Sequence, residues 1–365
     1  MAFDLKNAFS FLQRDSAVRG GDERSIGIDI GSASVKVVEL RKNAGTIMLS
    51  TYGELQLGPY SDQSSGMTVK LDQDQTVQAL VDVIRESGVA AKSGVLAVPL
   101  SSSFLTTIQI EAKSVEEVAK MIPVEARKYI PIPLNEVALD WYEIDADEND
   151  KGKTKREVLL AAIQNESLTH YQRLLSSVGM HTSPTEIEAF SAIRAVVEDP
   201  DATTAIIDLG ASMSKLYIVD GYELQKIHRV KTGGEQLTKQ LAELRNVSFG
   251  EAEAIKREQA STEAYAKDVK TAMQATMQRP FQEFKRVIQQ YQNLHEVQLG
   301  RVHIIGGGAQ LDQVSEYVSE ALSLEPVVHN PFAKIAYPAF MSDVLEELGS
   351  SFAVSLGAAL RPYME

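Results

Sequence analysis

Two segments that lie far apart in the chain share one pattern of chemically useful side chains. Asp29 and Asp208 each end an apolar, strand-like run, and a glycine follows two residues later, at Gly31 and Gly210. Small hydroxyl residues fill each turn, and a lysine stands seven residues after each aspartate. The hydroxyl residues are Ser32, Ser34, Ser212 and Ser214, and the lysines are Lys36 and Lys215. One copy would be weak evidence, but two copies predict a duplicated β-hairpin.

These residue types suit a polyphosphate and its metal ion. A glycine in the turn permits positive φ and lets backbone N–H groups, such as that of Ala211, approach phosphate oxygens without a Cβ in the way. The serines add hydroxyl donors, and the lysines would offset the phosphate charge. Asp29 and Asp208 would repel phosphate directly, so we expect them to hold Mg²⁺ through its retained waters. The alternative is that each Asp-x-Gly only makes a tight turn and that the lysines are solvated.

A third glycine-centred segment follows the buried, strand-like run 302–305. Gly306, Gly307 and Gly308 stand between that run and an expected helix. Backbone at such a turn can lie flat against a ribose or an adenine, and the helix N-terminus would add its positive end. The segment is not a Rossmann fingerprint, and the chain has no Walker A loop. The alternative is a flexible strand-to-helix turn.

The composition excludes several classes of function. With 365 residues, 44% apolar and 24% charged, the chain is typical of a soluble globular protein of two domains. Its formal net charge of −14 would repel phosphate backbones, so a nucleic-acid partner is not expected. There is no cysteine for a disulfide or thiolate site, and the six histidines lack the spacing of a two-histidine metal helix. No apolar run approaches the roughly 20 residues of a membrane-spanning helix.

The three glycine-centred segments, in this order, resemble the actin, Hsp70 and sugar-kinase superfamily. The wording IGIDIGSASVKVVEL, EARKYIPIPLNEVALDW, TGGEQLTKQLAELRNVSFGEAEAIK and IIGGGAQL is similar to the PilM family of pilus-assembly proteins, which is related to FtsA. The similarity covers about residues 25–361, and segment 128–133 discriminates most because sugar kinases lack it. It implies an α/β fold of the actin-like ATPase type, with two duplicated domains and an inserted subdomain of the FtsA/PilM kind.

The resemblance also implies domain boundaries. Residues 1–24 would form an N-terminal tail, residues 25–201 the first domain and residues 202–365 the second. The inserted subdomain would occupy about 104–180, interrupted by a solvated charged loop at 145–155, and a helical insertion would occupy about 235–299. Within that insertion five apolar residues are spaced to lie on one face of a helix, and this face is predicted to pack in the core. They are Phe281, Phe284, Val287, Ile288 and Tyr291.

Further site residues follow from the same resemblance. Gly233 and Gly234 open a helix after an apolar strand, where relatives place the ribose. Glu253 and Lys256 share a helix face and would serve the adenosine pocket, although a solvated salt bridge explains them equally well. Glu188 would orient the attacking water beside the aspartates, but Glu186 competes for that role, and Glu188 could equally be a helix-capping carboxylate.

The expected cofactors are ATP and Mg²⁺, with at most slow hydrolysis. The resemblance implies a cytoplasmic scaffold, peripheral to the inner membrane through its partners, that recruits the N-terminal tail of a PilN-like protein. The tail would dock as an extended peptide or short helix beside the inserted subdomain. Contacts with other pilus platform proteins and self-association are compatible with this role. One alternative is an FtsA-like polymerising division ATPase, which normally ends in an amphipathic helix that this chain lacks after 351–360. The other is a metabolic kinase.

Overall fold

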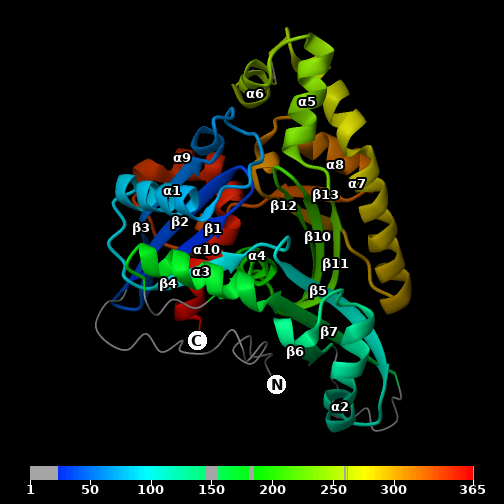
Figure 1. The fold of residues 1–365 in the computed structure, drawn as a ribbon. Helices are drawn as coiled ribbons and strands as arrows, with labels where there is room; N and C mark the ends of the chain where they lie inside the picture. The colour runs from blue at the N-terminus through cyan, green and yellow to red at the C-terminus, as the bar shows by residue number, and fades with distance from the viewer. Residues whose placement is uncertain (1–23, 145–154, 181–184, 259, 261, 365) are drawn as a thin grey trace.

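Two five-stranded sheets with the same strand order form the centre of the molecule (Figure 1). The computed structural model describes residues 24–144, 155–180, 185–258, 260 and 262–364. The first sheet has the order β3-β2-β1-β4-β8, and the second has the order β11-β10-β9-β12-β13. Their bounds are β1 Arg24–Ile30, β2 Ser34–Asn43, β3 Thr46–Gln56, β4 Gly94–Val98, β8 Thr185–Ile187, β9 Thr203–Leu209, β10 Ser214–Asp220, β11 Glu223–Val230, β12 Arg301–Ile305 and β13 Glu325–Val328.

Each sheet starts as an antiparallel meander and continues with parallel strands. β1 pairs antiparallel with β2 and parallel with β4, and β9 pairs antiparallel with β10 and parallel with β12. The strands at the centre are covered on both faces, which explains their near-continuous apolar runs. Ile26, Ile28, Ile206 and Ile207 are fully buried. The matching sheets confirm the expected α/β fold of two duplicated domains.

The last helix of the chain packs on the first sheet. α10 (Ala353–Leu360) lies against β1, β2 and α4 (Glu188–Val196). The approach is close because a Cβ on Gly27 would lie 1.8 Å from the Ser355 carbonyl oxygen, and a Cβ on Gly357 would lie 1.8 Å from the Ser191 carbonyl oxygen. Both helices connect the two halves of the molecule at this contact.

The segment that leads into α10 also belongs to the core of the first sheet. The apolar side chains of this segment pack with Val38, Leu40 and Leu49 of β2 and β3. They are Phe332, Ile335, Leu345 and Phe352. The other helices of this half are α1 (Gln73–Glu86), α3 (Asn165–Ser177) and α9 (Ser342–Leu348). The division of the chain at residue 201 stays a prediction, because the polypeptide crosses back after β13.

A three-stranded antiparallel sheet is inserted after β4 and lies beneath the second sheet (Figure 1). Its order is β5-β7-β6, with bounds β5 Ser103–Glu111, β6 Val137–Glu143 and β7 Lys155–Gln164. α2 (Val115–Glu125) covers one face, where Val118 and Ile122 meet Ile108 and Ile110 of β5 in a separate core. This sheet and α2 correspond to the predicted inserted subdomain, whose bounds of about 104–180 stay a prediction.

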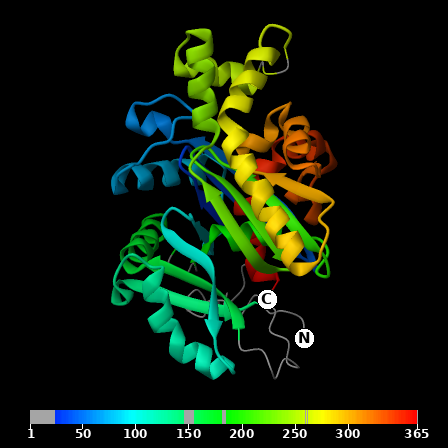
Figure 2. The same ribbon diagram turned by 90° about the vertical axis from the view of Figure 1, so that its right-hand side faces the viewer.

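The second half carries a helical insertion between β11 and β12. It consists of α5 (Gly234–Arg245), α6 (Phe249–Glu258) and α7 (Ala266–His295), and α8 (Val314–Leu322) follows β12. Figure 2 shows α7 crossing the face of the sheet that carries β10 and β11. The predicted apolar face of α7 is confirmed as core, since Phe281, Phe284, Ile288 and Tyr291 are buried and Val287 is half-buried against them.

Two predicted segments fall outside the described residues. These are the tail at 1–24, apart from Arg24 in β1, and the charged loop at 145–155, apart from Lys155 in β7. Within the described ranges, none of the helices combines the length and the apolar character that a bilayer crossing needs.

Candidate functional site

Each predicted aspartate faces its lysine across an antiparallel hairpin. Asp29 on β1 pairs in register with Lys36 on β2, and Asp208 on β9 pairs with Lys215 on β10. Opposed residues of antiparallel strands project from the same face of the sheet. The shared seven-residue spacing therefore places a carboxylate and an ammonium on one face in both halves of the molecule.

The two turns favour glycine because a Cβ would lie close to a backbone oxygen, and not because the backbone has positive φ. The Gly31 N–H donates to the Ser34 carbonyl oxygen at 3.0 Å, and the Gly210 N–H donates to the Met213 carbonyl oxygen at 3.1 Å. A Cβ on either glycine would lie 3.0 Å from that same oxygen. Contrary to the expectation from sequence, neither has positive φ; Gly306 does, at 86°.

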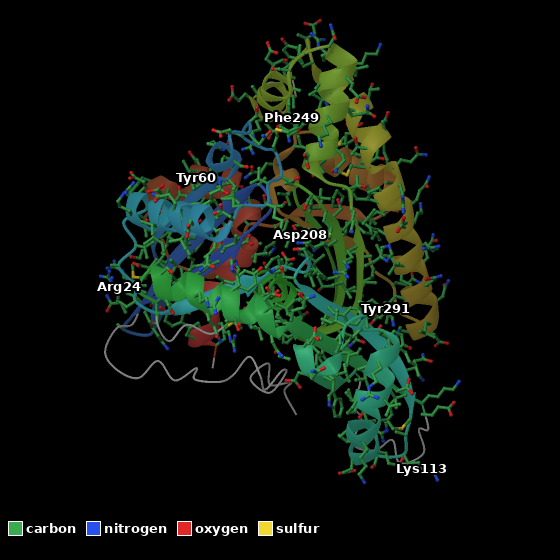
Figure 3. The ribbon with its side chains drawn as sticks, viewed as in Figure 1. Arg24, Tyr60, Lys113, Asp208, Phe249 and Tyr291 are labelled. Atoms are coloured by element: carbon green, nitrogen blue, oxygen red, sulfur yellow. The ribbon has the colours of Figure 1, made fainter. Side chains whose placement is uncertain are left out.

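The two hairpin turns and the Gly306 turn lie together between the halves. Ser32 Oγ donates to Ser212 Oγ at 2.9 Å, so the hairpin tips touch. A Cβ on Gly306 would lie 2.5 Å from Asp208 Oδ1. Figure 3 shows Asp208 near the centre of the molecule, where the two halves meet. The three segments that the sequence singles out are neighbours in space.

Lys215 joins two carboxylates in a buried ion triad. Its Nζ donates to Glu188 Oε2 at 2.7 Å and to Asp208 Oδ2 at 2.9 Å. The other oxygen of Glu188, Oε1, accepts the N–H of Leu100 at 2.6 Å. Burial alone would lower the pKa of Lys215, but the charges of Asp208 and Glu188 outweigh it and hold that pKa well above its usual value. Lys215 is therefore a permanent cation in this centre.

Asp29 has a different environment from Asp208. Burial raises the pKa of Asp29 to about 6, Lys36 opposes the shift, and the negative charge of Glu188 adds to it. Lys36 Nζ donates to Ser34 Oγ at 2.9 Å and lies 3.4 Å from Glu54 Oε1. The carboxylate of Asp29 is thus the less compensated of the two, and a cation bound beside it would be stabilised.

The two glutamates that competed for the catalytic role lie in different networks. Glu186 forms a buried pair with Arg194 at 2.6 and 3.0 Å and accepts from Ser191 Oγ at 2.5 Å. Arg361 Nη1 lies 3.5 Å from its Oε2. Glu188 is the first residue of α4, but its carboxylate bonds Leu100 and Lys215 instead of capping that helix. Of the two, Glu188 faces the aspartates.

The three consecutive glycines do not open an α-helix, contrary to the prediction. A 3-10 turn spans Gly307–Gln310, and α8 begins only at Val314, so its positive end is not placed by the glycines. Their contribution is close approach to β9, because a Cβ on Gly308 would lie 2.7 Å from Leu209 Cβ. A Cβ on Gly307 would meet nothing within 4 Å.

Gly233 and Gly234 start α5 as predicted, and Gly233 is in close contact with the second hairpin turn. The Gly234 N–H donates to the Gly210 carbonyl oxygen at 3.0 Å, and the Glu235 N–H donates to the Ala211 carbonyl oxygen at 2.9 Å. A Cβ on Gly233 would lie 2.4 Å from the same Gly210 oxygen. Gly233 therefore lets α5 pack on the second hairpin turn.

Glu253 and Lys256 form a buried ion pair at 2.5 Å, not a solvated one. Thr238 Oγ1 donates to Glu253 Oε2, and Arg257 Nε donates to Glu253 Oε1, both at 2.6 Å. Burial lowers the pKa of Lys256. Burial alone would raise the pKa of Glu253, but Lys256 and the hydrogen bond from Arg257 outweigh it and lower that pKa. This cluster is a fixed set of charges at the start of the helical insertion.

Sequence reasoning missed three contacts of this region. Arg257 stands four residues after Glu253, and this helical spacing is the signal that could have found it. Thr68 Oγ1 donates to Glu235 Oε2 at 2.5 Å, and a Cβ on Gly66 would lie 2.5 Å from Glu253 Cδ. These contacts join the loop before α1 to α5 and α6 across the two halves. No local sequence pattern predicts these contacts between the loop and the two helices.

The chemistry of this donor set suits a phosphate ligand with a hydrated cation. The hairpin tips present hydroxyl groups, and the two aspartates end the strands behind them. A carboxylate with a raised pKa, such as Asp29, gains most from a nearby cation. Among the described residues, no cluster of three or more acidic or histidine side chains is spaced to hold a metal ion directly.

Comparison with known proteins gives the context of this site. The family model described as "Type IV pilus assembly protein PilM" matches residues 27–363. The cell division protein FtsA of Enterococcus hirae is 22% identical over 88% of this chain and 84% of its own length. FtsA of Enterococcus faecalis is 23% identical over 63% of this chain, and the match spans only 57% of that relative.

Solved structures show the same fold. A PilM–PilN type IV pilus biogenesis complex matches with a TM-score of 0.76 and 22% identity, covering 93% of this chain and 98% of the other. The ethanolamine utilization protein EutJ from Carboxydothermus hydrogenoformans matches at 0.56 with 16% identity, covering 94% and 91%. MreB5 of Spiroplasma citri bound to ADP matches at 0.51 with 11% identity, covering 92% and 94%. The fold is that of the actin-like ATPases, and the chain belongs to the PilM family of type IV pilus assembly proteins.

Proposed function

We propose that this protein binds Mg-ATP between its two halves and acts as a cytoplasmic scaffold of type IV pilus assembly. The observation that carries the nucleotide part is the meeting of the two Asp-x-Gly hairpins, Ser32 against Ser212, with Gly306 against Asp208. Family membership supports the pilus role, and the MreB5 protein of the same fold was solved with ADP.

The residues of the site have distinct roles in this proposal. Asp29 and Asp208 hold Mg²⁺ through its waters, and Ser32 and Ser212 exchange their mutual hydrogen bond for bonds to phosphate oxygens. Further donors around the phosphates come from the two turns and from the lysine of the first hairpin. These residues are Gly31, Ser34, Lys36, Gly210 and Ala211. The ribose and adenine lie by the second half, near Gly234, Glu253, Lys256 and the turn Gly306–Gly308. Bound Mg²⁺ supplies positive charge that neutralises the phosphates.

The partner in this proposal is the N-terminal tail of a PilN-like inner-membrane protein. The support is the family match and the structural likeness to a chain from a PilM–PilN complex. Such a tail binds as an extended peptide or short helix beside the inserted sheet β5-β7-β6. The protein then lies at the inner membrane through this partner.

Nucleotide binding is tested with aspartate variants. Asp29→Ala and Asp208→Ala should weaken Mg-ATP binding in equilibrium dialysis while the circular dichroism spectrum stays that of the wild type. Asp29→Ala should lose more affinity, because Lys215 already compensates Asp208. Asp220→Ala, at the exposed far end of β10, is the matched control and should bind as the wild type does. Undiminished binding in both site variants would remove the aspartates from the proposal.

The pilus role is tested by recovering partners from cell extract with the full chain and identifying them by mass spectrometry. Inner-membrane pilus components are the expected result. Recovery of the division ring would favour the FtsA-like function, and ATP turnover that accelerates when metabolites are supplied would favour a kinase.

A further inference from the structure

A large aromatic side chain stands exposed beside α9. Phe340 lies in the 3-10 turn Ala339–Met341 that leads into this helix, and 86% of its surface is exposed. Val344 follows four residues later and is 45% exposed. All charged side chains of segment 335–348 are acidic and exposed. With the two apolar residues they form the Phe340 patch, which consists of Phe340, Asp343, Val344, Glu346 and Glu347.

A second exposed patch lies on the inserted subdomain and has the opposite charge. Val124, near the end of α2, is 60% exposed, and Tyr129 is exposed just beyond the helix. Within segment 118–134 the exposed charged side chains are all basic. The one acidic residue there, Glu125, is partly buried and lies 2.7 Å from the ammonium of Lys128. The Val124 patch consists of Lys120, Val124, Arg127, Lys128 and Tyr129.

The exposed acidic residues of α2 lie in its first turn, before the Val124 patch. They are Glu116 and Glu117, and Glu117 Oε2 accepts the N–H of Lys113 at 2.7 Å. Carboxylates at this place suit the positive end of a helix. Val124 and Arg127 lie about two turns or more further along, so the charge around them stays positive.

The two patches match each other in pattern and in charge. Lys120, Val124 and Arg127 share one face of α2, because they are spaced four and three residues apart. Val344 and Glu347 share a face of α9 for the same reason. A lone exposed apolar side chain needs no explanation, but two that are flanked by complementary charges indicate a shared contact.

The two patches lie at opposite ends of the molecule. Figure 1 shows α9 on the side of the first sheet and α2 at the far tip of the inserted subdomain. They therefore cannot contact each other within one folded chain, whereas the Phe340 patch of one copy can contact the Val124 patch of another. A contact between unlike surfaces leaves one patch of each kind free at the ends of every pair, so further copies can add.

We infer that this protein associates with itself head to tail, with the Phe340 patch of one copy docked on the Val124 patch of the next. The inference is independent of nucleotide binding and of the pilus partner. Each patch is far smaller than the roughly 20–30 residues per side of a stable interface, so a single contact is weak. The array therefore forms where the local concentration of the protein is high.

Disulfide trapping tests this contact directly, because the chain has no cysteine and an introduced thiol reports one position. Val124→Cys and Val344→Cys proteins are mixed at high concentration, oxidised mildly and separated on a non-reducing gel. Because docking brings the two thiols together, they should link at least about tenfold faster than in the control mixture of Val124→Cys with Val328→Cys. Val328 is the matched control, since it is 42% exposed but lies on β13, outside both patches. Equal rates in the two mixtures would overturn the inference.

The same variants distinguish a head-to-tail array from a symmetric dimer. Val124→Cys alone should link to itself no faster than the control mixture, because the array does not place two Val124 patches together. The double variant Val124→Cys/Val344→Cys should give a ladder of linked species. A single dimer band without a ladder would contradict the array.

Charge reversal tests the pairing of the two patches. Arg127→Glu, added to the Val124→Cys protein, should slow linkage to Val344→Cys by about two- to fivefold, the size of an exposed ion pair. Glu347→Arg, added to the Val344→Cys protein, should restore the rate. Both side chains are exposed, and circular dichroism checks that the fold is kept. Linkage that ignores the first reversal, or is not restored by the second, would contradict the proposed docking.

Discussion

Glu186 and Glu188 stand two residues apart, yet one carboxylate holds the molecule together and the other faces its centre. Glu186 pairs with Arg194 and lies near Arg361, and all three side chains are largely buried. Burial alone would raise the pKa of Glu186, but the charge of Arg194 outweighs it and lowers that pKa. A buried pair of this kind contributes little net stability while intact, and its loss is costly because one charge is left without compensation.

Replacement of Glu186 by glutamine should therefore destabilise the fold. We expect Glu186→Gln to lower the free energy of unfolding by about 3 kcal/mol, measured by urea titration, because Arg194 keeps its buried charge. The control is Glu325→Gln, whose partner Arg301 is exposed with it, and the loss there should stay within about 1 kcal/mol. Equal effects in the two variants would contradict the structural role of Glu186.

At this scale the sequence predicted the residue types but not their partners. Asp29 and Asp208 follow one pattern, and each aspartate faces the lysine of its own hairpin. The pattern could not predict that Lys215 reaches Glu188, because that contact depends on where α4 begins relative to β10. Equal local sequence thus led to unequal environments through tertiary packing.

Among the elements, α10 is the one whose packing depends most on glycine, which has no side chain. It is enclosed by β1 on one side and α4 on the other, with a glycine at each contact. Gly27→Ala should lower the free energy of unfolding by at least about 3 kcal/mol, because the new Cβ meets backbone and not a movable side chain. A Cβ on Gly300 meets nothing within 4 Å, so Gly300→Ala is the control and should change stability little. Comparison of denaturation midpoints decides the matter.

The end of α4 is held by two basic side chains from the segment after β13. His329 Nε2 donates to the Ala195 carbonyl oxygen at 3.1 Å, and Lys334 Nζ donates to the carbonyl oxygens of Arg194, at 3.0 Å, and Val197. Burial lowers the pKa of His329 from 6.5 to about 4. Burial likewise lowers the pKa of Lys334, to about 8.

This depressed histidine pKa predicts loss of stability in acid. Between pH 6.5 and 4 the unfolded chain binds the proton that folded His329 refuses, so stability is complete above pH 6.5 and falls as the pH is lowered. The loss reaches roughly 3 kcal/mol at pH 4. His329→Gln should flatten that part of the stability-versus-pH curve relative to the wild type, measured by urea titration at each pH. Parallel curves for the two proteins would rule the histidine out as the cause.

The types of the elements were more predictable from sequence than the structural roles of their glycines. The hairpins, the start of α5 and the apolar face of α7 follow from local periodicity and turn chemistry. In place of an α-helix directly after Gly306 to Gly308 there is a 3-10 turn, and Gly233 allows close packing. The sequence of a turn does not show which other segment will contact it.

On the scale of the whole molecule, two contacts join the halves on either side of the central site. Above it, Thr68 of the first half bonds Glu235 of α5. Below it, the inserted sheet holds the edge strand β11, where the Tyr142 hydroxyl donates to the Leu224 carbonyl oxygen at 3.2 Å and accepts its N–H at 3.0 Å. Lys226 of the same strand forms an ion pair with Glu157 of β7. The inserted sheet is thus bonded to the second half although it is inserted in the first.

With nucleotide bound as proposed, loss of the upper contact should speed nucleotide release. Thr68→Val removes a hydrogen bond to a buried carboxylate, and we expect the release of a fluorescent ATP analogue in stopped flow to quicken by about tenfold. Thr271→Val removes a local bond on α7 and is the control, for which no change is expected. An unchanged release rate in Thr68→Val would mean that this contact does not limit opening.

The position of α10 also sets an order of events during synthesis. The strand that packs on it, β1, ends at Ile30, and the helix starts at Ala353, so 322 residues are added between them. At ribosomal speeds of about 5–20 residues per second, the first sheet waits roughly a quarter of a minute to a minute for the helix that covers it. Until then that apolar face stays uncovered, and it is exposed to wrong contacts for longer than in a chain whose domains close in sequence.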